Sequence, residues 1–303
     1  MTACMITEEM VKNIVEKRRR EIHKGDCGRI LMVAGSEGMM GAAVLTCTAA
    51  LRSGAGLVQL AVPKDLFPIA QIAVPEATCL DRNFNTIDLD RYDVIAVGPG
   101  LGESRESVDF VKELLEKWTG RLVLDADGLN IAAHNDLLDK LRMRDGETII
   151  SPHMGEAQRL AEAAAKAGVI SEETLKELDF RSSGQSMREY IAYVLSEAWG
   201  AVTILKGQHT VVTSGGEVSY INTTGNPGMA TGGSGDVLTG ILAGLWGQKG
   251  RDGNRHSALD IAGAGVYIHG MAGDLAAEKL GEYGLIAGDI AGHVPFAVKK
   301  LSE

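Results

Sequence analysis

The sequence predicts an α/β protein in which helices cover both faces of a central, mainly parallel sheet. Short apolar runs alternate with stretches of helical spacing through the first two thirds of the chain, and most of these runs are continuous. Continuous apolar runs are typical of strands that are buried on both faces. Because strand and helix alternate repeatedly, the strands are expected to pair in parallel through right-handed crossovers.

The apolar runs also give the expected order of elements. Strands are expected at residues 29–34, 57–62, 93–97, 121–124, 148–150 and 201–205, with helices between them at about 42–53, 104–118, 154–167 and 186–198. Beyond residue 201 the runs HTVVTSG and EVSYINTTG meet at Gly215-Gly216, which predicts a hairpin and hence an antiparallel edge. Three helices rich in small residues are expected at about 234–246, 256–279 and 286–300.

The N-terminal segment is expected to be helical. Thr7 is followed by two glutamates, which is typical of a helix start, and the basic run at 18–20 favours the C-terminal end of the same helix. The chain contains no linker, low-complexity tract or internal repeat. We therefore expect residues 1–303 to form a single domain, with residues 1–26 as an N-terminal helical extension.

Composition excludes several classes of partner. The net charge of −10 argues against nucleic acid and anionic membranes, because both need a basic surface. No uninterrupted apolar run has the length of a membrane span, and the first residues place acids before basic residues, the reverse of a signal peptide. The four cysteines form no CxxC pair, which fits reduced thiols better than a zinc site or a disulfide framework. A cytoplasmic protein is expected.

Glycine is frequent, with 38 among 303 residues, about 13% against a usual ~7%. The common glycine-rich motifs are nevertheless incomplete. There is no GxxxxGK[ST] and no HExxH; Glu103 stands where a dinucleotide fingerprint starting at Gly98 needs its third glycine, and Asp236 ends the would-be nucleophile elbow around Ser234. These departures argue against a P-loop ATPase, a zincin, a Rossmann dehydrogenase and an α/β-hydrolase in their usual forms.

The segment 222–236 carries the strongest functional signal. The glycines of the run GGSG at residues 232–235 allow successive backbone amides to point at one position, and the helix expected to begin near Ser234 adds its positive end. An anion is therefore expected there. A carboxylate beside an anion site repels phosphate unless it has a chemical task, such as accepting the proton of an attacking hydroxyl. We predict that Asp236 is catalytic, rather than a simple first-turn acid that stabilises the helix dipole.

This segment resembles the signature of a known family. GNPGMATGGSGDVLTG is similar to the signature of the ADP-dependent NAD(P)H-hydrate dehydratases, a branch of the ribokinase-like superfamily. Seven further blocks agree with that family over about residues 27 to 290: GRILMVAGSEGMMGAA, LRSGAGLV, DVIAVGPGLG, LVLDADGLN, ISPHMGEAQRL, ILKGQHTVV and HGMAGD. The resemblance implies a ribokinase-like three-layer α/β/α sandwich, mainly parallel with an antiparallel edge.

The resemblance also implies most of the site residues. The expected substrate contacts are Ala42, Gly102, Asn130, His153 and Asp236. The expected nucleotide contacts are Lys206, Gly207, Gln208, His209, Thr210, Gly233, Ser234 and Gly235. Side-chain chemistry agrees at three of these positions, because Lys206 offers a point charge for phosphate, Thr210 a hydroxyl, and Asn130 a neutral amide that can bind a carboxamide.

By the same resemblance, the expected activity is dehydration of (S)-NADHX and (S)-NADPHX, the hydrated forms of NADH and NADPH. ADP or ATP would be the co-substrate, assisted by Mg²⁺. Hydroxide is a poor leaving group, so the ring hydroxyl is expected to be phosphorylated first and then lost as phosphate. In related sugar kinases an Asn-x-x-Glu motif organises Mg²⁺ through water; here Glu156 matches the acid but His153 replaces the asparagine. The metal ligands therefore stay open, with Glu156 as a candidate.

Other interpretations stay open at this point. A ribokinase-superfamily kinase that acts on a sugar, hydroxymethylpyrimidine or hydroxyethylthiazole would share the same signature, and a nucleotide sensor without chemistry would share the anion site. The run HGMAGD at residues 269–274 is expected to serve mainly in close packing. The resemblance implies a homotetramer. About 26 residues precede the first matching block, too few for the epimerase domain that many relatives carry, so a separate NAD(P)HX epimerase is expected.

Overall fold

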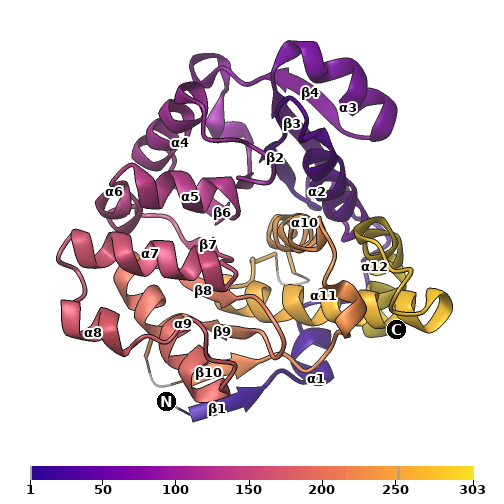
Figure 1. Ribbon diagram of the computed structural model, residues 1–303. Helices are drawn as coiled ribbons and strands as arrows, with labels where there is room; N and C mark the ends of the chain where they lie inside the picture. Colours follow the sequence, from indigo (N-terminus) through magenta and orange to yellow (C-terminus); the bar gives the residue numbers. More distant parts are fainter. Residues whose placement is uncertain (1, 217, 251–252) are drawn as a thin grey trace.

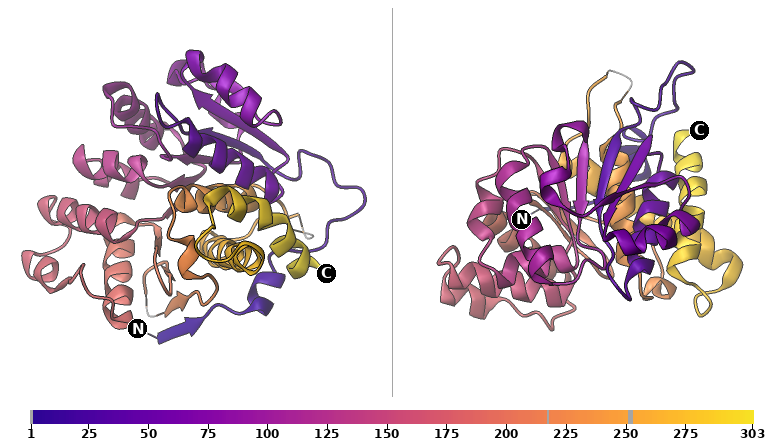
Figure 2. Two further views of the ribbon diagram at one scale, coloured as in Figure 1. Left: turned by 45° about the vertical axis from the view of Figure 1, so that its right-hand side comes forward. Right: turned by 90° about the horizontal axis from the view of Figure 1, so that it is seen from above.

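A computed structural model describes residues 2–216, 218–250 and 253–303. In these residues a ten-stranded sheet is covered by helices on both faces (Figure 1), and the view from above in Figure 2 shows the sheet between two helical layers. The strand order is β1-β10-β9-β8-β7-β6-β5-β2-β3-β4. The predicted α/β sandwich is therefore confirmed.

Among the described strands, β9 alone runs against its two neighbours, whereas the other pairs are parallel. The strands are β1 Thr2–Met5, β2 Arg29–Val33, β3 Leu57–Val62, β4 Thr78–Asp81, β5 Val94–Val97, β6 Arg121–Leu124, β7 Thr148–Ile150, β8 Val202–Leu205, β9 Val211–Thr213 and β10 Val218–Ile221. The predicted hairpin is the β9–β10 pair, and the antiparallel part of the sheet is the run β8-β9-β10 near one edge.

The helices are α1 Glu8–Lys12, α2 Met40–Arg52, α3 Phe67–Ala73, α4 Arg105–Lys117, α5 Asp127–His134, α6 Leu138–Arg142, α7 Met154–Lys166, α8 Glu172–Glu177, α9 Gln185–Trp199, α10 Ser234–Trp246, α11 Ala258–Leu280 and α12 Ala287–Ser302. The seven predicted helical stretches beyond the N-terminal segment agree with helices of the structure to within a few residues, whereas the short helices α3, α5, α6 and α8 were not predicted. Four short 3₁₀ helices are η1 Lys64–Leu66, η2 Phe84–Thr86, η3 Leu89–Arg91 and η4 Pro227–Met229.

The sheet separates two apolar cores. On β2, Ile30 and Met32 join the core under α2, α10, α11 and α12, whereas Leu31 and Val33 join the core under α4 to α9. Successive side chains of a strand point to opposite faces, so a strand buried on both faces must be apolar throughout. This explains why the continuous runs predicted the parallel strands.

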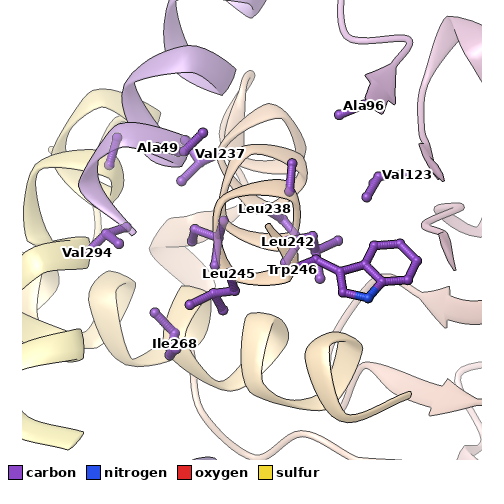
Figure 3. Packing of buried hydrophobic residues seen from close by; sticks show 14 of the residues in the cluster. Ala49, Ala96, Val123, Val237, Leu238, Leu242, Leu245, Trp246, Ile268 and Val294 are labelled. Atoms are coloured by element: carbon purple, nitrogen blue, oxygen red, sulfur yellow. The ribbon is translucent and has the colours of Figure 1, made fainter. Parts of the chain in front are cut away.

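The helix α10 lies at the centre of the first core. Figure 3 shows its residues Val237, Leu242 and Trp246 among side chains of α2, α11, α12 and the sheet. Gly240 and Gly244 face α2: an added Cβ at Gly244 would lie 2.6 Å from the Ala50 carbonyl oxygen. The two glycines therefore let α10 and α2 approach closely, which fixes the position of the N-terminus of α10, where the anion site was predicted.

The N-terminal segment differs from the prediction of a long helix. Thr7 does cap α1, since its hydroxyl oxygen accepts from the Met10 amide at 3.3 Å. The helix nevertheless ends at Lys12, and residues 2–5 form β1, paired in parallel with β10. The exposed strand sequence TACM has no alternating apolar pattern, and Val15 is buried beyond the helix end, so tertiary packing overrides the charge pattern here.

No helix in the described part of the chain is both long and apolar enough to cross a membrane.

Candidate active site

The predicted site residues gather at the carboxyl ends of the parallel strands. Loops after β2, β5, β6, β7 and β8 carry them, and the N-terminus of α10 lies at the same edge. Figure 1 shows α10 nearly end-on, in the layer that also holds α2, α11 and α12. In open parallel sheets ligands bind at this edge, because all loops there follow strands of the same direction.

The first turn of α10 has the backbone that an anion site needs. Gly233 has a positive φ of 90°, and it precedes Ser234 at the first position of the helix. Among the described contacts, no side chain caps the amides of this turn; the Ser234 amide donates to the Thr231 carbonyl oxygen at 3.3 Å, and no partner is seen there for the Gly235 and Asp236 amides. Free amides at a helix N-terminus and the helix dipole together attract negative charge. The run predicted from GGSG is therefore placed as an anion site requires.

A buried cluster of charges lies beside this turn. The Lys206 amino group donates to Asp125 Oδ1 at 2.7 Å and lies 3.7 Å from Glu156 Oε2. Thr239, on α10, donates to the other oxygen of Asp125 at 2.7 Å. An added Cβ at Gly235 would lie 3.3 Å from the Lys206 amino nitrogen, so the lysine reaches the first turn of α10. The charge that was predicted to face phosphate is thus shared with two buried carboxylates.

Asp236 lies in a position that makes its carboxylate unusually basic. Burial, together with the negative charge of Asp125, raises the pKa of Asp236 to about 7, although the Lys206 ammonium lowers it. Burial opposes the charge on Lys206 itself, but the neighbouring carboxylates outweigh it and raise the pKa of the lysine. A general base works best when its pKa lies near the working pH. Asp236 therefore has the environment of a general base rather than that of a simple helix-dipole acid.

His153 and Glu156 form a capping box at the start of α7. The Glu156 carboxylate accepts from the His153 amide at 2.7 Å, while His153 Nδ1 accepts from the Gly155 amide at 3.0 Å. Because Nδ1 accepts, Nε2 carries the ring proton, and it lies 3.3 Å from Glu156 Oε1. The His153 side chain is 56% exposed, so its ring is accessible for the predicted substrate contact.

The donor set does not form a direct cage for Mg²⁺. Within the ranges that the structure describes, no group of three His, Cys, Asp or Glu side chains could hold a metal ion. The oxygens of Glu156 already face the His153 amide and ring and the Lys206 ammonium. Those of Asp125 face Lys206 and Thr239. Direct ligation by Glu156 would therefore require these contacts to be given up.

The loops after β5 and β6 are tied together on the predicted substrate side. The Gly102 amide donates to Asp127 Oδ2 at 2.8 Å, so Asp127, the first residue of α5, holds the neighbouring loop. Ala42, on α2, is half-buried; its Cβ would lie 2.9 Å from a Cβ added at Gly100. Larger side chains at these positions would push α2 and the loop after β5 apart.

Asn130 is also placed on this side, and it has an ionic neighbour. Its Oδ1 accepts from Arg159 Nε at 2.9 Å, which leaves the Asn130 amide hydrogens as the free donors. Arg159 comes from α7, one turn beyond the capping box of His153. The geometry thus places Asn130 beside Arg159 on α7, the helix that begins directly after His153. The substrate contacts expected for Asn130 and His153 stay a prediction.

The loop after β8 is largely open. Gly207, Gln208 and His209 are exposed, and His209 has a positive φ of 52°. Thr210 turns back on the loop, since its hydroxyl donates to the Gly207 carbonyl oxygen at 2.8 Å. Arg188, on α9, donates to the carbonyl oxygens of Leu205 and Lys206, where the loop begins. The loop is therefore held at its base while its outer backbone stays accessible, and its predicted nucleotide contacts stay a prediction.

Three residues of the site were missed by the sequence analysis. Asp125 was visible as a polar residue at a strand end, but its pairing with Lys206, 81 positions away, had no sequence signal. Thr239 lies inside an apolar helical stretch, and Arg159 on a helix of mixed polarity. The His153-x-x-Glu156 spacing did carry a signal, because residues at N-cap and N3 can form a capping box.

The fold and the site together define a class: a ribokinase-like α/β protein with an anion site and a basic carboxylate at the N-terminus of one helix. The profile of the NAD(P)H-hydrate dehydratase family matches residues 30–295. The chain belongs to this family.

Curated relatives agree with that membership. The chain is 38% identical to the bifunctional NAD(P)H-hydrate repair enzyme of Moorella thermoacetica over 99% of its length, which is 54% of that relative. It thus spans about half the length of the bifunctional relatives. It is also 31% identical to the ADP-dependent (S)-NAD(P)H-hydrate dehydratase of Listeria monocytogenes, covering 98% of this chain and 97% of the relative.

Solved structures agree on the fold. The ADP/ATP-dependent NAD(P)H-hydrate dehydratase of Bacillus subtilis, co-crystallised with ATP and Mg²⁺, superposes with a TM-score of 0.81 at 27% identity, and the similarity covers 100% of both chains. A ribokinase-like superfamily protein of Enterococcus faecalis gives a TM-score of 0.80 at 25% identity, covering 99% of this chain and 96% of the other.

Proposed function

We propose that this chain removes water from the hydrated nicotinamide ring of (S)-NADHX and (S)-NADPHX, with ADP or ATP as co-substrate. The observation that carries the proposal is the position of Asp236, a largely buried carboxylate with a pKa of about 7, in the first turn of α10. Its place beside the free amides of that turn suits transfer of a phosphoryl group to a hydroxyl. The names of the full-length relatives supply the substrate class.

In the proposed reaction, Asp236 accepts the proton of the ring hydroxyl while the hydroxyl oxygen bonds to the terminal phosphorus of ADP. The bond between that phosphorus and its bridging oxygen breaks, and AMP leaves. The electron pair of the ring nitrogen then expels phosphate, and loss of a ring proton restores the double bond. The overall change is NADHX and ADP to NADH, AMP and phosphate; with ATP the nucleotide product is ADP.

The residues around Asp236 have separate tasks in this proposal. The amides of residues 233–235 hold the phosphoryl group that moves, and the loop 206–210 holds the rest of the nucleotide. Ala42, Gly102, Asn130 and His153 bound the dinucleotide on the opposite side. Since the buried carboxylates have other partners, we propose that Mg²⁺ comes with the phosphates of the nucleotide, as is usual for this ion.

The test is turnover of hydrated NADH by the wild-type chain with ADP and, separately, with ATP, followed by the absorbance of the dihydronicotinamide. Asp236→Asn should still bind nucleotide, but its turnover rate should be lower by about 10²–10⁴-fold, the usual contribution of a general base. Turnover of that variant near the wild-type rate would contradict the role of Asp236. A stable phosphorylated product from a sugar, hydroxymethylpyrimidine or hydroxyethylthiazole, without any dehydration, would instead favour the kinase interpretation.

We also propose that the chain works in the cytoplasm beside a separate epimerase. Hydration creates a stereocentre on the ring, and a dehydratase specific for the S form leaves the other form unrepaired. The word bifunctional in the names of the longer relatives supports a second activity on a neighbouring domain. A homotetramer is the proposed assembly; exposed apolar side chains around the turn between α11 and α12, namely Leu280, Tyr283 and Ile286, support self-association. Sedimentation analysis would test the assembly.

A further inference from the structure

The run HGMAGD on α11 lies against the loop that leads into the anion site. Four of its six residues, at positions 269, 270, 273 and 274, contact the segment between β10 and α10. Positions four apart on a helix share one face, and 269/273 and 270/274 are two such pairs. The segment 222–234 lies along this face of α11, as Figure 1 shows.

Polar contacts fix the two ends of the segment. At its start, Asn222 donates to the Val266 carbonyl oxygen at 3.1 Å, and the Thr224 hydroxyl donates to the Tyr267 carbonyl oxygen at 2.9 Å. At its end, the Ser234 hydroxyl lies 3.3 Å from His269 Nε2. The segment is thus attached to α11 at both ends.

Asp274 holds the middle of the segment with both carboxylate oxygens. The Gly225 amide donates to Oδ2 at 2.9 Å, and the Asn226 side-chain amide donates to Oδ1 at 2.9 Å. Asn226 in turn accepts from the Gly228 amide at 3.0 Å through its side-chain oxygen, which forms the turn at η4. The carboxylate therefore determines the shape of the turn and not only its attachment.

The two glycines of the run allow the segment to lie close. An added Cβ at Gly273 would overlap the Met229 thioether and lie 2.7 Å from Met229 Cγ. One at Gly270 would lie 2.6 Å from the Thr224 carbonyl carbon. Real Cβ atoms are not found this close to other atoms. A larger residue at Gly270 must therefore displace the backbone of the segment, and one at Gly273 must move the Met229 side chain that packs there.

From these contacts we infer that the face His269, Gly270, Gly273 and Asp274 of α11 positions the phosphate-binding amides of residues 233–235. These are positioning residues: they act through the loop and do not touch the reacting atoms. The inference rests on the proposed nucleotide site. It predicts that nucleotide affinity, and not the affinity for the hydrated cofactor, responds when this face is altered.

Gly273→Ala gives the sharpest test, because the atom that it meets belongs to a flexible side chain that can be shortened. Moving Met229 should shift the residues that lead to the helix start, and loss of one amide contact with a charged phosphate corresponds to about tenfold or more in affinity, so the Kd for ADP should rise by at least about tenfold. Met229→Ala in the Gly273→Ala background should bring the Kd back to within about threefold of wild type, because it removes the overlap.

The matched control is Gly263→Ala on the same helix, where an added Cβ would meet only Ile6 Cδ1 at 3.9 Å. Its Kd for ADP should equal that of the wild type. Titration calorimetry with ADP alone measures these values whether or not the protein dehydrates hydrated NADH, so a failure of the proposed reaction does not affect the result. Steady-state KM values for the two substrates give the second measurement.

An ADP Kd in Gly273→Ala within twofold of the control would overturn the inference, as would an equal rise in both KM values. A Kd that stays high in the double variant would also overturn it, since the overlap with Met229 would then not be the cause. Thermal melting of each variant shows whether the protein is folded. Asp274→Asn, which keeps one acceptor oxygen and replaces the other with a donor, is the second variant if Gly273→Ala does not fold, and its ADP Kd is expected to rise in the same way.

Discussion

The pH dependence of turnover offers a test of the charge cluster around Asp236. The wild-type rate should rise with pH through about 7, because Asp236 must be ionised to accept a proton. Lys206 and Asp125 act on that pKa in opposite directions. Lys206→Met removes the positive charge and should move the acidic limb of the profile to higher pH. Asp125→Asn removes a negative charge and should move it to lower pH.

The expected size of these shifts rests on both groups lying beside the residue that precedes Asp236. Lys206 reaches the first turn of α10, where an added Cβ on Gly235 would lie 3.3 Å from its amino nitrogen, and the same Cβ would also lie 3.9 Å from Asp125 Oδ2. A charge within about 4–6 Å shifts a carboxyl pKa by about 1–3 units. We expect the limb to move by roughly one unit or more in each variant, in opposite directions. The measured value belongs to the coupled cluster, because these groups titrate together.

The assay is the initial rate at saturating ADP and hydrated NADH between about pH 5.5 and 9, at constant ionic strength, with circular dichroism at each pH. Damage to the fold would lower the rate of both variants without moving their limbs apart. If both limbs stay at the wild-type position, or both move the same way, Asp236 is not the group that controls the rate.

Three further predictions concern stability. Asp236→Asn should stabilise the protein at neutral pH. Because the pKa of Asp236 is raised, the folded state keeps a proton between about pH 4 and 7 that the unfolded state has lost, so the stability of the wild type falls as the pH rises through that range. Melts at several pH values should show a loss on the order of 2–4 kcal/mol relative to the variant. Gly240→Ala should lower the free energy of unfolding by about 1–3 kcal/mol, since its Cβ would lie 2.7 Å from Ala49 Cβ. Gly263→Ala, where the added Cβ meets no close neighbour, should cause no such loss. Equal denaturation midpoints for the two variants would contradict the close packing of α10 on α2. Trp246→Phe should cost about 1–3 kcal/mol, because it leaves a cavity where the fully buried indole packs and weakens the contact with Arg121, 5.9 Å from the ring centroid. The buried indole N–H has no partner among the described residues, so the loss comes from packing, and an unchanged midpoint of chemical denaturation would contradict it.

The fold was readable from the sequence where burial leaves a pattern. Strand β5 is apolar throughout because α10 covers one face and α4 and α5 the other, and the prediction located it correctly. Strand β1 is exposed along its length, so no apolar pattern marks it. Its strand conformation comes from pairing with β10, a contact more than 200 positions away that no local signal records.

The site was readable in part, for the same reason. Glycines and helix starts are local features, and they predicted an anion site at residues 232–235, where the structure places the N-terminus of α10. The pairing of Lys206 with Asp125 depends on two strands being neighbours of a third, which the sequence did not specify. The prediction for Lys206 was therefore incomplete: it assigned the lysine charge to phosphate, but it did not include Asp125 and Glu156, the two carboxylates that share this charge.

That shared charge decides how an acidic site can bind an anion. Asp125 is 1% exposed and accepts from Lys206 and Thr239, so most of the lysine charge is balanced within the protein. The attraction for a phosphoryl group must then come mainly from the backbone amides of α10, which bring no mobile charge and cannot be titrated. Lys206 instead limits the repulsion between Asp125 and Asp236. Without the lysine, two buried carboxylates would share one region, and Asp236 would hold its proton at neutral pH and be unable to act as a base.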